Sequence, residues 1–230
     1  MSNEPNDDDT IPEYASPACF MHEIDRAYMG LSANKDQPID IAKWRQAERQ
    51  RLIAERLALS QDERQSFSGL IAKGLDELVP DVSGKAISLY WPFRGEPDLR
   101  EWMADVTARG GTCLLPLVAG KGQPLVFRAW KAGDKLERGV WNIPYPAEGP
   151  EIVPDIVIAP LVGFDPAFYR LGYGGGYYDR TLASHPGSPL VIGVGYQQQA
   201  IATIHPQAHD IPMQAIVTER EIRTRTTPSG

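Results

Sequence analysis

Glycine fills four of the five positions from 172 to 176, between an Arg-Leu pair and the run Tyr-Tyr-Asp-Arg. Glycine loses more backbone entropy on folding than any other residue, so a dense, ordered cluster is costly. Such a loop suits a place where main-chain N–H groups must come close to a ligand. Phosphate is the first candidate if Tyr177–Ala183 is a helix, because N–H groups converge at a helix N-terminus. A tight turn between a strand and a helix is the alternative.

The glycine spacing excludes two common nucleotide-binding motifs. A G-x-G-x-x-G motif that starts at Gly172 needs glycine at position 177, where the chain has tyrosine. A G-x-x-x-x-G-K-[ST] motif occurs nowhere in the chain. The sequence therefore supports neither a dinucleotide-binding fold nor a P-loop.

Arginines share one face of a predicted helix. Arg45 and Arg49 are one helical turn apart, about 6 Å along the axis, and Arg56 lies between them in angle. Because arginine binds phosphate oxygens in a planar, bidentate way, this face suits neighbouring phosphates of one triphosphate. The alternative is a solvated basic face paired with Glu48 and Glu55.

Asp179 and Asp210 are candidate Mg²⁺ ligands, because this ion typically takes one or two carboxylates plus substrate phosphates and waters. A single aspartate after a turn is more often a helix cap. His205 and His209 have the i, i+4 spacing of zinc ligands, but Pro206 and the lack of a third ligand argue against zinc. We expect both histidines to be structural or to act through a neighbouring residue of the site rather than as metal ligands.

Apolar periodicity predicts the elements that position these residues. Helices are expected over residues 41–59, 60–79, 97–109 and 177–183, and strands over 86–90, 113–118, 125–130, 156–159, 191–194 and 215–217. Ser60 and Glu63 fit a capping box. Short continuous apolar runs are typical of strands buried on both faces, so we expect an α/β fold, a single domain with a mostly parallel sheet flanked by helices and an N-terminal helical pair. Residues 131–154 lack a regular pattern, and long ordered loops are usually functional.

Charge is unevenly distributed along the chain of 230 residues, which is 42% hydrophobic and has a net charge of −7. Residues 1–40 hold nine acidic and two basic residues, and 21 of each kind follow. The remainder thus lacks the basic field that drives nucleic-acid binding, so we expect no nucleic-acid partner. We expect an acidic, flexible arm over residues 1–40, the α/β domain over 41–222 and a flexible tail over 223–230.

Cys19 and Cys113 have no paired spacing, which fits a reducing compartment and excludes a cysteine-based zinc site. No apolar run approaches the ~20 residues that span a bilayer, and the acidic start is unlike a secretory or mitochondrial leader. We therefore expect a cytoplasmic protein without a membrane partner, and a monomer is favoured over an oligomer.

Residues 164–180 resemble the signature of the 5-formyltetrahydrofolate cyclo-ligase family, also called methenyltetrahydrofolate synthetase. The matching residues are Phe164-Asp165, Arg170-Leu171-Gly172 and Gly174-Gly175-Gly176-Tyr177-Tyr178-Asp179-Arg180. Further matches in the family's order are Arg45, Arg49, Glu96, Trp141-Asn142-Ile143-Pro144 and His209-Asp210. The resemblance covers roughly residues 43–220, and the R-L-G-x-G-G-G-Y-Y-D-R string is too specific for a chance match.

The resemblance implies an ATP- and magnesium-dependent ring closure that converts 5-formyltetrahydrofolate to 5,10-methenyltetrahydrofolate and releases ADP and phosphate. It implies catalytic roles for Arg49 and Arg170, and a Mg²⁺ ion on Asp179 and Asp210. The implied folate contacts are Trp91, Glu96, Trp141 and Tyr177. The implied ATP contacts are Arg45, Arg49, Arg170, Leu171, Gly172, Tyr173, Gly174, Gly175, Gly176, Tyr177 and Tyr178. Tyr173 and Gly175 stand where some relatives carry a basic side chain, which leaves the three arginines and the loop backbone to neutralise the phosphates.

Other interpretations stay open. Each tryptophan fits a core position equally well, and Glu96 fits the start of a helix. At the level of function, a regulatory module would bind folate and nucleotide without forming the methenyl product. An isomerase or transferase of a phosphorylated small molecule rests on fold analogy alone and predicts no ATP requirement.

Overall fold

A seven-stranded sheet is the centre of the computed structural model, which describes residues 40–225. The strand order is β11 (Ile222–Thr224), β10 (Ala215–Val217), β9 (Leu190–Val194), β6 (Ile156–Pro160), β1 (Ala86–Ser88), β2 (Thr112–Val118) and β3 (Leu125–Ala129). The five inner strands pair in parallel, whereas β11 and β3 pair antiparallel at the two edges. The predicted α/β fold with a mostly parallel sheet is confirmed.

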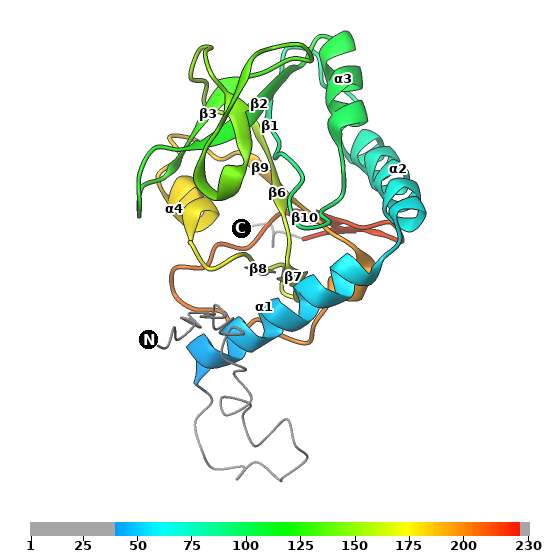
Figure 1. Cartoon of the computed structure of the whole chain (residues 1–230), viewed down its shortest axis with the longest axis vertical. Coiled ribbons are helices and arrows are strands. Elements are labelled where there is room, and N and C mark those ends of the chain that lie inside the picture. Colours follow the sequence, from blue (N-terminus) through cyan, green and yellow to red (C-terminus); the bar gives the residue numbers. More distant parts are fainter. Residues whose placement is uncertain (1–39, 226–230) are drawn as a thin grey trace, which may run out of the picture. The chain divides into compact units, whose positions relative to one another are not determined.

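Helices cover both faces of the sheet (Figure 1). The four α-helices of the described residues are α1 (Ile41–Ala58), α2 (Gln61–Leu78), α3 (Arg100–Ala108) and α4 (Tyr177–Ala183). Buried residues of α2 and α3, such as Leu75 and Met103, share the main apolar core with Ile87, Ile158 and other strand residues. Residues of α4 pack on a second cluster on the opposite face, and α1 packs on a third cluster through Leu52.

The predicted helical pair α1–α2 is confirmed, and its capping is visible. The Ser60 N–H donates to Glu63 Oε2 (2.8 Å), and the Glu63 N–H donates to Ser60 Oγ (3.2 Å). This reciprocal capping box begins α2 directly after α1 ends, so the chain turns between the two helices without a long loop.

Two small hairpins stand outside the main sheet, and neither was predicted. One pairs β7 (Gly163–Phe164) with β8 (Arg170–Leu171) within the signature segment. The other pairs β4 (Leu136–Arg138) with β5 (Pro144–Pro146) across the short 3₁₀ turn η3 (Val140–Asn142), so part of the stretch 131–154 has regular structure. Strands of two or three residues are too short to produce a periodic pattern.

Three predicted boundaries differ from the structure by two residues or more. Helix α3 begins at Arg100 rather than at Pro97, and β1 ends at Ser88 rather than at Tyr90. The predicted tail over 223–230 begins too early, because β11 continues to Thr224 and Ile222 packs against the core. Of the predicted arm over 1–40, only Asp40, the N-cap of α1, lies within the described residues. Within residues 40–225, no helix has the length and apolar character needed to cross a membrane.

Candidate active site

The candidate active site lies where the strand order of the sheet reverses. The chain passes from β1 to β2 on one side, whereas β6 and the later parallel strands are added on the other side of β1. Open α/β sheets bind ligands at the carboxyl ends of the strands at such a switch point. A cavity opens there, lined by residues that follow β1, by Pro160 at the end of β6 and by Pro116–Val118 at the end of β2.

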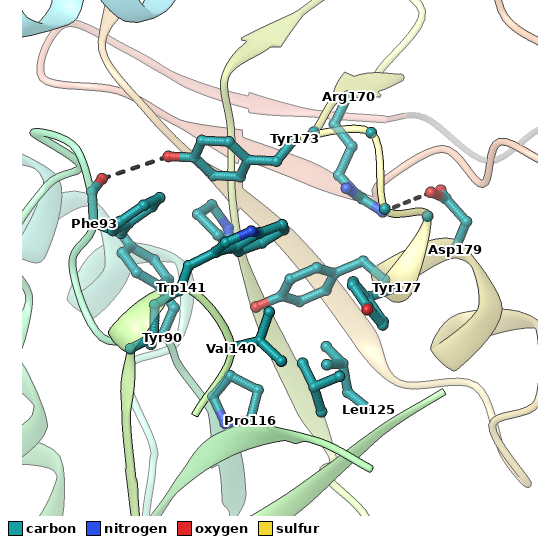
Figure 2. Close-up of a pocket in the computed structure, with 18 of the residues that line it drawn as sticks. Tyr90, Phe93, Pro116, Leu125, Val140, Trp141, Arg170, Tyr173, Tyr177 and Asp179 are labelled. Carbon is teal, nitrogen blue, oxygen red and sulfur yellow. Dashed lines mark hydrogen bonds and ion pairs between the residues drawn. The ribbon is translucent and has the colours of Figure 1, made fainter. Parts of the chain in front are cut away.

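This cavity brings together all sixteen residues to which the sequence assigned a ligand, a metal or a catalytic role. They are Arg45, Arg49, Trp91, Glu96, Trp141, Asp210 and every residue from position 170 to 179. Sequence reasoning missed other lining residues, notably Tyr90, Phe93 and Val140 (Figure 2). The position of Tyr90 and Phe93 just beyond the carboxyl end of a central strand was the signal that would have identified them.

The glycine loop, residues 172–176, connects β8 to α4 and carries unpaired N–H groups. Among residues 40–225, no backbone N–H from position 173 to 179 donates a hydrogen bond to the protein. Gly174 and Gly176 have φ values of 93° and 62°, which favour glycine. The predicted helix after the loop is confirmed as α4, whose N-cap is Gly176. The loop thus offers N–H donors at a helix start, as an anion site requires.

Arg170 lies at the edge of this loop and is almost fully buried, with 5% of its side chain exposed. Its Nη2 lies 3.0 Å from Asp179 Oδ2 (Figure 2). Its guanidinium lies 5.0 Å from the centre of the Tyr178 ring. Its Nε has no hydrogen-bond partner among the described residues. A buried cationic donor without a partner is costly, so the site favours an anion beside Arg170.

Arg49 reaches the same loop from α1. Its Nε donates to the Gly172 carbonyl (2.6 Å), and a Cβ added at Gly174 would lie 3.4 Å from its Cζ. Partial burial and the neighbouring charge of Arg45 lower the pKa of the Arg49 guanidinium, while Asp210 acts in the opposite direction. The hydrogen bond to Gly172 and the short distance to Gly174 place the Arg49 guanidinium directly over the glycine loop.

Arg45 has a different environment from the one its helix position suggested. It forms an ion pair with Asp210 and also donates to the carbonyls of Ile204 (3.0 Å) and His205 (3.0 Å). These contacts use four of its five N–H donors. Arg56 is fully buried and does not line the cavity. The predicted face of three phosphate-binding arginines is thus divided, and Arg49 is the one that lies on the glycine loop.

The two aspartates lie close to each other at the rim of the cavity. Asp179 Oδ1 accepts the N–H of Ile211 (3.3 Å), the residue after Asp210. Burial would raise the pKa of the Asp210 carboxyl, but the hydrogen bonds from Arg45 and from the Gln207 N–H hold it below its ordinary value. Within residues 40–225, no cluster of three or more Asp, Glu, His and Cys side chains could hold a metal. Two carboxylates fit an ion that takes its remaining ligands from phosphates and water, as Mg²⁺ does.

His205 and His209, for which a structural role was predicted, have different environments. His205 packs edge-on against Trp44, with ring centres 4.6 Å apart, and its carbonyl accepts from Arg45. His209 is exposed, lines the cavity and lies 3.8 Å from Asp210 Oδ1 through its Nε2.

Aromatic rings form the opposite side of the cavity (Figure 2). The Trp141 ring is nearly parallel to Phe93, with centres 6.4 Å apart, and lies 6.2 Å from Tyr173. Trp141 has a φ of 55° and is 53% exposed, so it is not a core residue. Trp91 packs edge-on against Trp130 and lines the same cavity. This side offers flat, apolar surfaces to a planar ring.

Glu96 is the one acid on the aromatic side. It is buried, and its two carboxyl oxygens accept hydrogen bonds from the Phe93 N–H (2.9 Å) and from the Tyr173 hydroxyl (2.9 Å). Burial raises the pKa of Glu96 to about 7, although Arg56, Tyr173 and the Phe93 N–H all act to lower it. It does not start the helix, because α3 begins four residues later.

A family model, a curated relative and two solved structures are similar to this chain. Residues 41–219 match a family model described as the 5-formyltetrahydrofolate cyclo-ligase family. The 5-formyltetrahydrofolate cyclo-ligase of Escherichia coli strain K12 is 27% identical over 179 residues, covering 73% of this chain and 96% of the relative. The solved structure of Aquifex aeolicus 5,10-methenyltetrahydrofolate synthetase is 31% identical, with a TM-score of 0.71, and the match covers 80% of this chain and 95% of that one. A synthetase structure from Mycoplasma pneumoniae, 24% identical with a TM-score of 0.64, shares the fold.

Proposed function

The chain belongs to the 5-formyltetrahydrofolate cyclo-ligase family, and on that premise we propose that it converts 5-formyltetrahydrofolate and ATP to 5,10-methenyltetrahydrofolate, ADP and phosphate. We further propose that the reaction requires Mg²⁺ and takes place in the cytoplasm. The single observation that carries the proposal is the cavity itself. Unpaired N–H groups and Arg170 form one side of it, and stacked aromatic rings with Glu96 form the other.

The chemistry of the substrate explains why ATP is needed. The N5-formyl group is an amide, so donation from nitrogen makes its carbon a poor electrophile and its oxygen a poor leaving group. Transfer of the γ-phosphoryl group to the formyl oxygen makes the carbon a better electrophile and turns the oxygen into part of a good leaving group. N5 then supplies electrons to form an iminium phosphate, N10 attacks the carbon and loses its proton, and phosphate leaves with the former formyl oxygen. The protein's task is chiefly positioning and charge neutralisation.

The two sides of the cavity match the two substrates. We assign the triphosphate to the glycine loop, where Arg49 and Arg170 neutralise charge and the N–H groups from 173 to 179 donate. We assign the pterin and aminobenzoyl rings to the aromatic side, where Trp141, Trp91 and Tyr177 offer ring faces and Glu96 accepts from ring N–H groups. The formyl group would then lie between the rings and the phosphates.

Asp179 and Asp210 are the residues that would hold Mg²⁺, which supplies charge neutralisation at the phosphates when bound. Each carboxylate already faces an arginine of the nucleotide side, Asp179 facing Arg170 and Asp210 facing Arg45. Both aspartates also line the cavity.

The proposal is tested by mixing the protein with 5-formyltetrahydrofolate, ATP and Mg²⁺ at neutral pH and following the absorbance of the methenyl product. We expect absorbance to rise only when all three are present, with one ADP formed per product molecule. Binding of both ligands without product would identify a regulatory module instead. Product formation at the same rate without ATP would contradict the proposal.

A further inference from the structure

Arg56 is the largest side chain that is wholly buried within the described residues, and it does not line the cavity. Its three nitrogens bind three separate segments. Nε donates to the Arg94 carbonyl (2.9 Å), Nη1 to the Leu161 carbonyl (2.9 Å) and Nη2 to the Tyr173 hydroxyl (2.5 Å). A buried guanidinium is costly, so this arrangement calls for a role beyond filling space.

The first segment is the turn that presents Glu96. Arg94 and Gly95 both have positive φ values, 48° and 75°, and the Glu96 N–H closes the turn on the Phe93 carbonyl (3.1 Å). A positive φ is strained for arginine, so the turn needs external support. Helix α1 gives that support, because Arg56 binds the Arg94 carbonyl and a Cβ at Gly95 would lie only 3.4 Å from Leu57 Cδ2.

The hydrogen bond from Arg56 to the Tyr173 hydroxyl fixes the direction of a hydrogen-bond chain. The Tyr173 hydroxyl accepts from Arg56, so its single proton is available for Glu96 Oε1 at 2.9 Å. The Phe93 carbonyl, which a dashed line joins to the same hydroxyl in Figure 2, is farther away at 3.4 Å. Glu96 therefore receives one bond at each oxygen. A carboxylate has about four lone-pair sites, so Glu96 keeps acceptor capacity on a side chain that lines the cavity.

We propose that Arg56 and Tyr173 act as positioning residues, forming a chain from α1 through the glycine loop that holds Glu96 as the acceptor for ring N–H groups of the folate. This inference rests on the proposed function, because it takes the aromatic side as the folate site. Arg56 acts only through its neighbours. The same chain joins the glycine loop to the turn that carries Glu96, so it links the nucleotide side of the cavity to the folate side.

The proposal has an electrostatic consequence that a merely structural contact would lack. The charged and titratable groups that face Glu96 are Arg56 from α1, Tyr90 after β1, Tyr173 from the glycine loop and Tyr178 from α4. Arg56 is the only cation among them. Because Arg56 and Tyr173 both lower the pKa of Glu96, loss of either raises that pKa further, and the carboxyl is then protonated at neutral pH.

Calorimetric titration of 5-formyltetrahydrofolate between pH 6 and 9 tests the chain without requiring turnover. The variants are Tyr173→Phe, Arg56→Lys and Arg56→Met. Arg51→Met is the matched control, because Arg51 lies on the same helix and, among residues 40–225, forms ion pairs only with Glu48 and Glu55. In the unaltered protein we expect affinity to fall as the pH drops through about 7.

In Tyr173→Phe and Arg56→Met we expect the midpoint of this pH dependence to rise by about one pH unit, which weakens folate binding at pH 7 roughly fivefold, because the ionised fraction falls from about one half to about one tenth. We expect Arg56→Lys to show a smaller rise, because the charge remains while the fork of donors is lost. Arg51→Met should match the unaltered protein.

Folded variants whose midpoint and affinity match the unaltered protein would overturn the inference, as would an equal loss at every pH. If Arg56→Met does not fold, Tyr173→Phe decides, because it removes only the hydroxyl group. If the unaltered protein binds no folate at any pH, the proposed function fails instead, so the two failures are distinguishable.

Discussion

The hydrogen bonds and ion pairs already formed decide which arginines in and near the cavity are available to an anion. Arg45 is held by Asp210 and two carbonyls, and Arg56 is held by two carbonyls and a hydroxyl. Arg49 makes one hydrogen bond, through Nε, and Arg170 faces one carboxylate. Positive charge with unused donors is therefore concentrated at the glycine loop, where Arg49 and Arg170 meet the unpaired N–H groups.

Replacing Asp179 with Asn removes one anionic ligand of the proposed Mg²⁺ site. We expect the Mg²⁺ concentration for half-maximal turnover to rise at least about tenfold, because an amide oxygen is a weaker ligand than a carboxylate. The measurement is turnover against Mg²⁺ at fixed ATP. Asp76→Asn is the control, because Asp76 pairs with Arg109 away from the cavity. An unchanged Mg²⁺ dependence in Asp179→Asn would refute the metal role.

Replacing Trp141 with Ala removes the exposed ring that stacks on Phe93. A stacking pair contributes roughly 0.5–1.5 kcal/mol, so we expect the folate KM to rise between about twofold and tenfold. The ATP KM should stay nearly constant, because Trp141 lies on the aromatic side. Steady-state kinetics with each substrate varied in turn provide the measurement. Equal increases in both constants would show that Trp141 supports the cavity as a whole.

At the scale of elements, the sequence predicted what has a long pattern and missed what is short. The helical pair, the capping box and α4 follow from periodicity and from Ser60 and Glu63. The hairpin β7–β8 and the hairpin β4–β5 do not, since their strands have two or three residues and, unlike the equally short β10, do not form a continuous aliphatic run. The close approach of Phe93 and Trp141 could not be predicted either, because it depends on where the β4–β5 hairpin packs.

The glycine loop offers a test of its own. Gly174→Ala adds a Cβ about 3.4 Å from Arg49 Cζ at a φ of 93°, so we expect weaker ATP binding together with a stability loss of about 1–2 kcal/mol. Gly84→Ala is the matched control, because Gly84 also has a positive φ, 68°, but nothing within 4 Å of the added Cβ. Thermal unfolding should show a loss in both variants. Nucleotide titration should show a loss in Gly174→Ala alone, and normal ATP affinity there would contradict the assigned loop role.

At the scale of the whole molecule, the topology explains why distant residues meet. The parallel sheet was predictable from buried apolar runs, but the strand order was not, because any order buries such runs equally well. The order places β1 beside β6, and the cavity opens at their carboxyl ends. The family resemblance supplied the residue assignments that the isolated motifs left open, and the fold brings those residues to one cavity.

Ligand binding at this cavity should stabilise the whole domain by mass action. At a concentration of about 100 times Kd, a ligand contributes about 2.7 kcal/mol, which corresponds to a rise in Tm of roughly 5–10 °C for a domain of this size. We expect ATP with Mg²⁺ to give such a rise and EDTA to remove most of it. The rise given by folate alone should survive EDTA. If EDTA also abolished the rise in Tm given by folate alone, the metal would act on folate binding, which contradicts its assignment to the nucleotide.

The transfer of phosphate to the formyl oxygen is the central claim, and an isotope label tests it most directly. The substrate is 5-formyltetrahydrofolate with ¹⁸O in the formyl group, turned over with ATP and Mg²⁺ in ordinary water, and the released phosphate is analysed by mass spectrometry. We predict one ¹⁸O atom in each phosphate molecule for each methenyl product formed. Unlabelled phosphate, with the ¹⁸O recovered in water, would contradict the account.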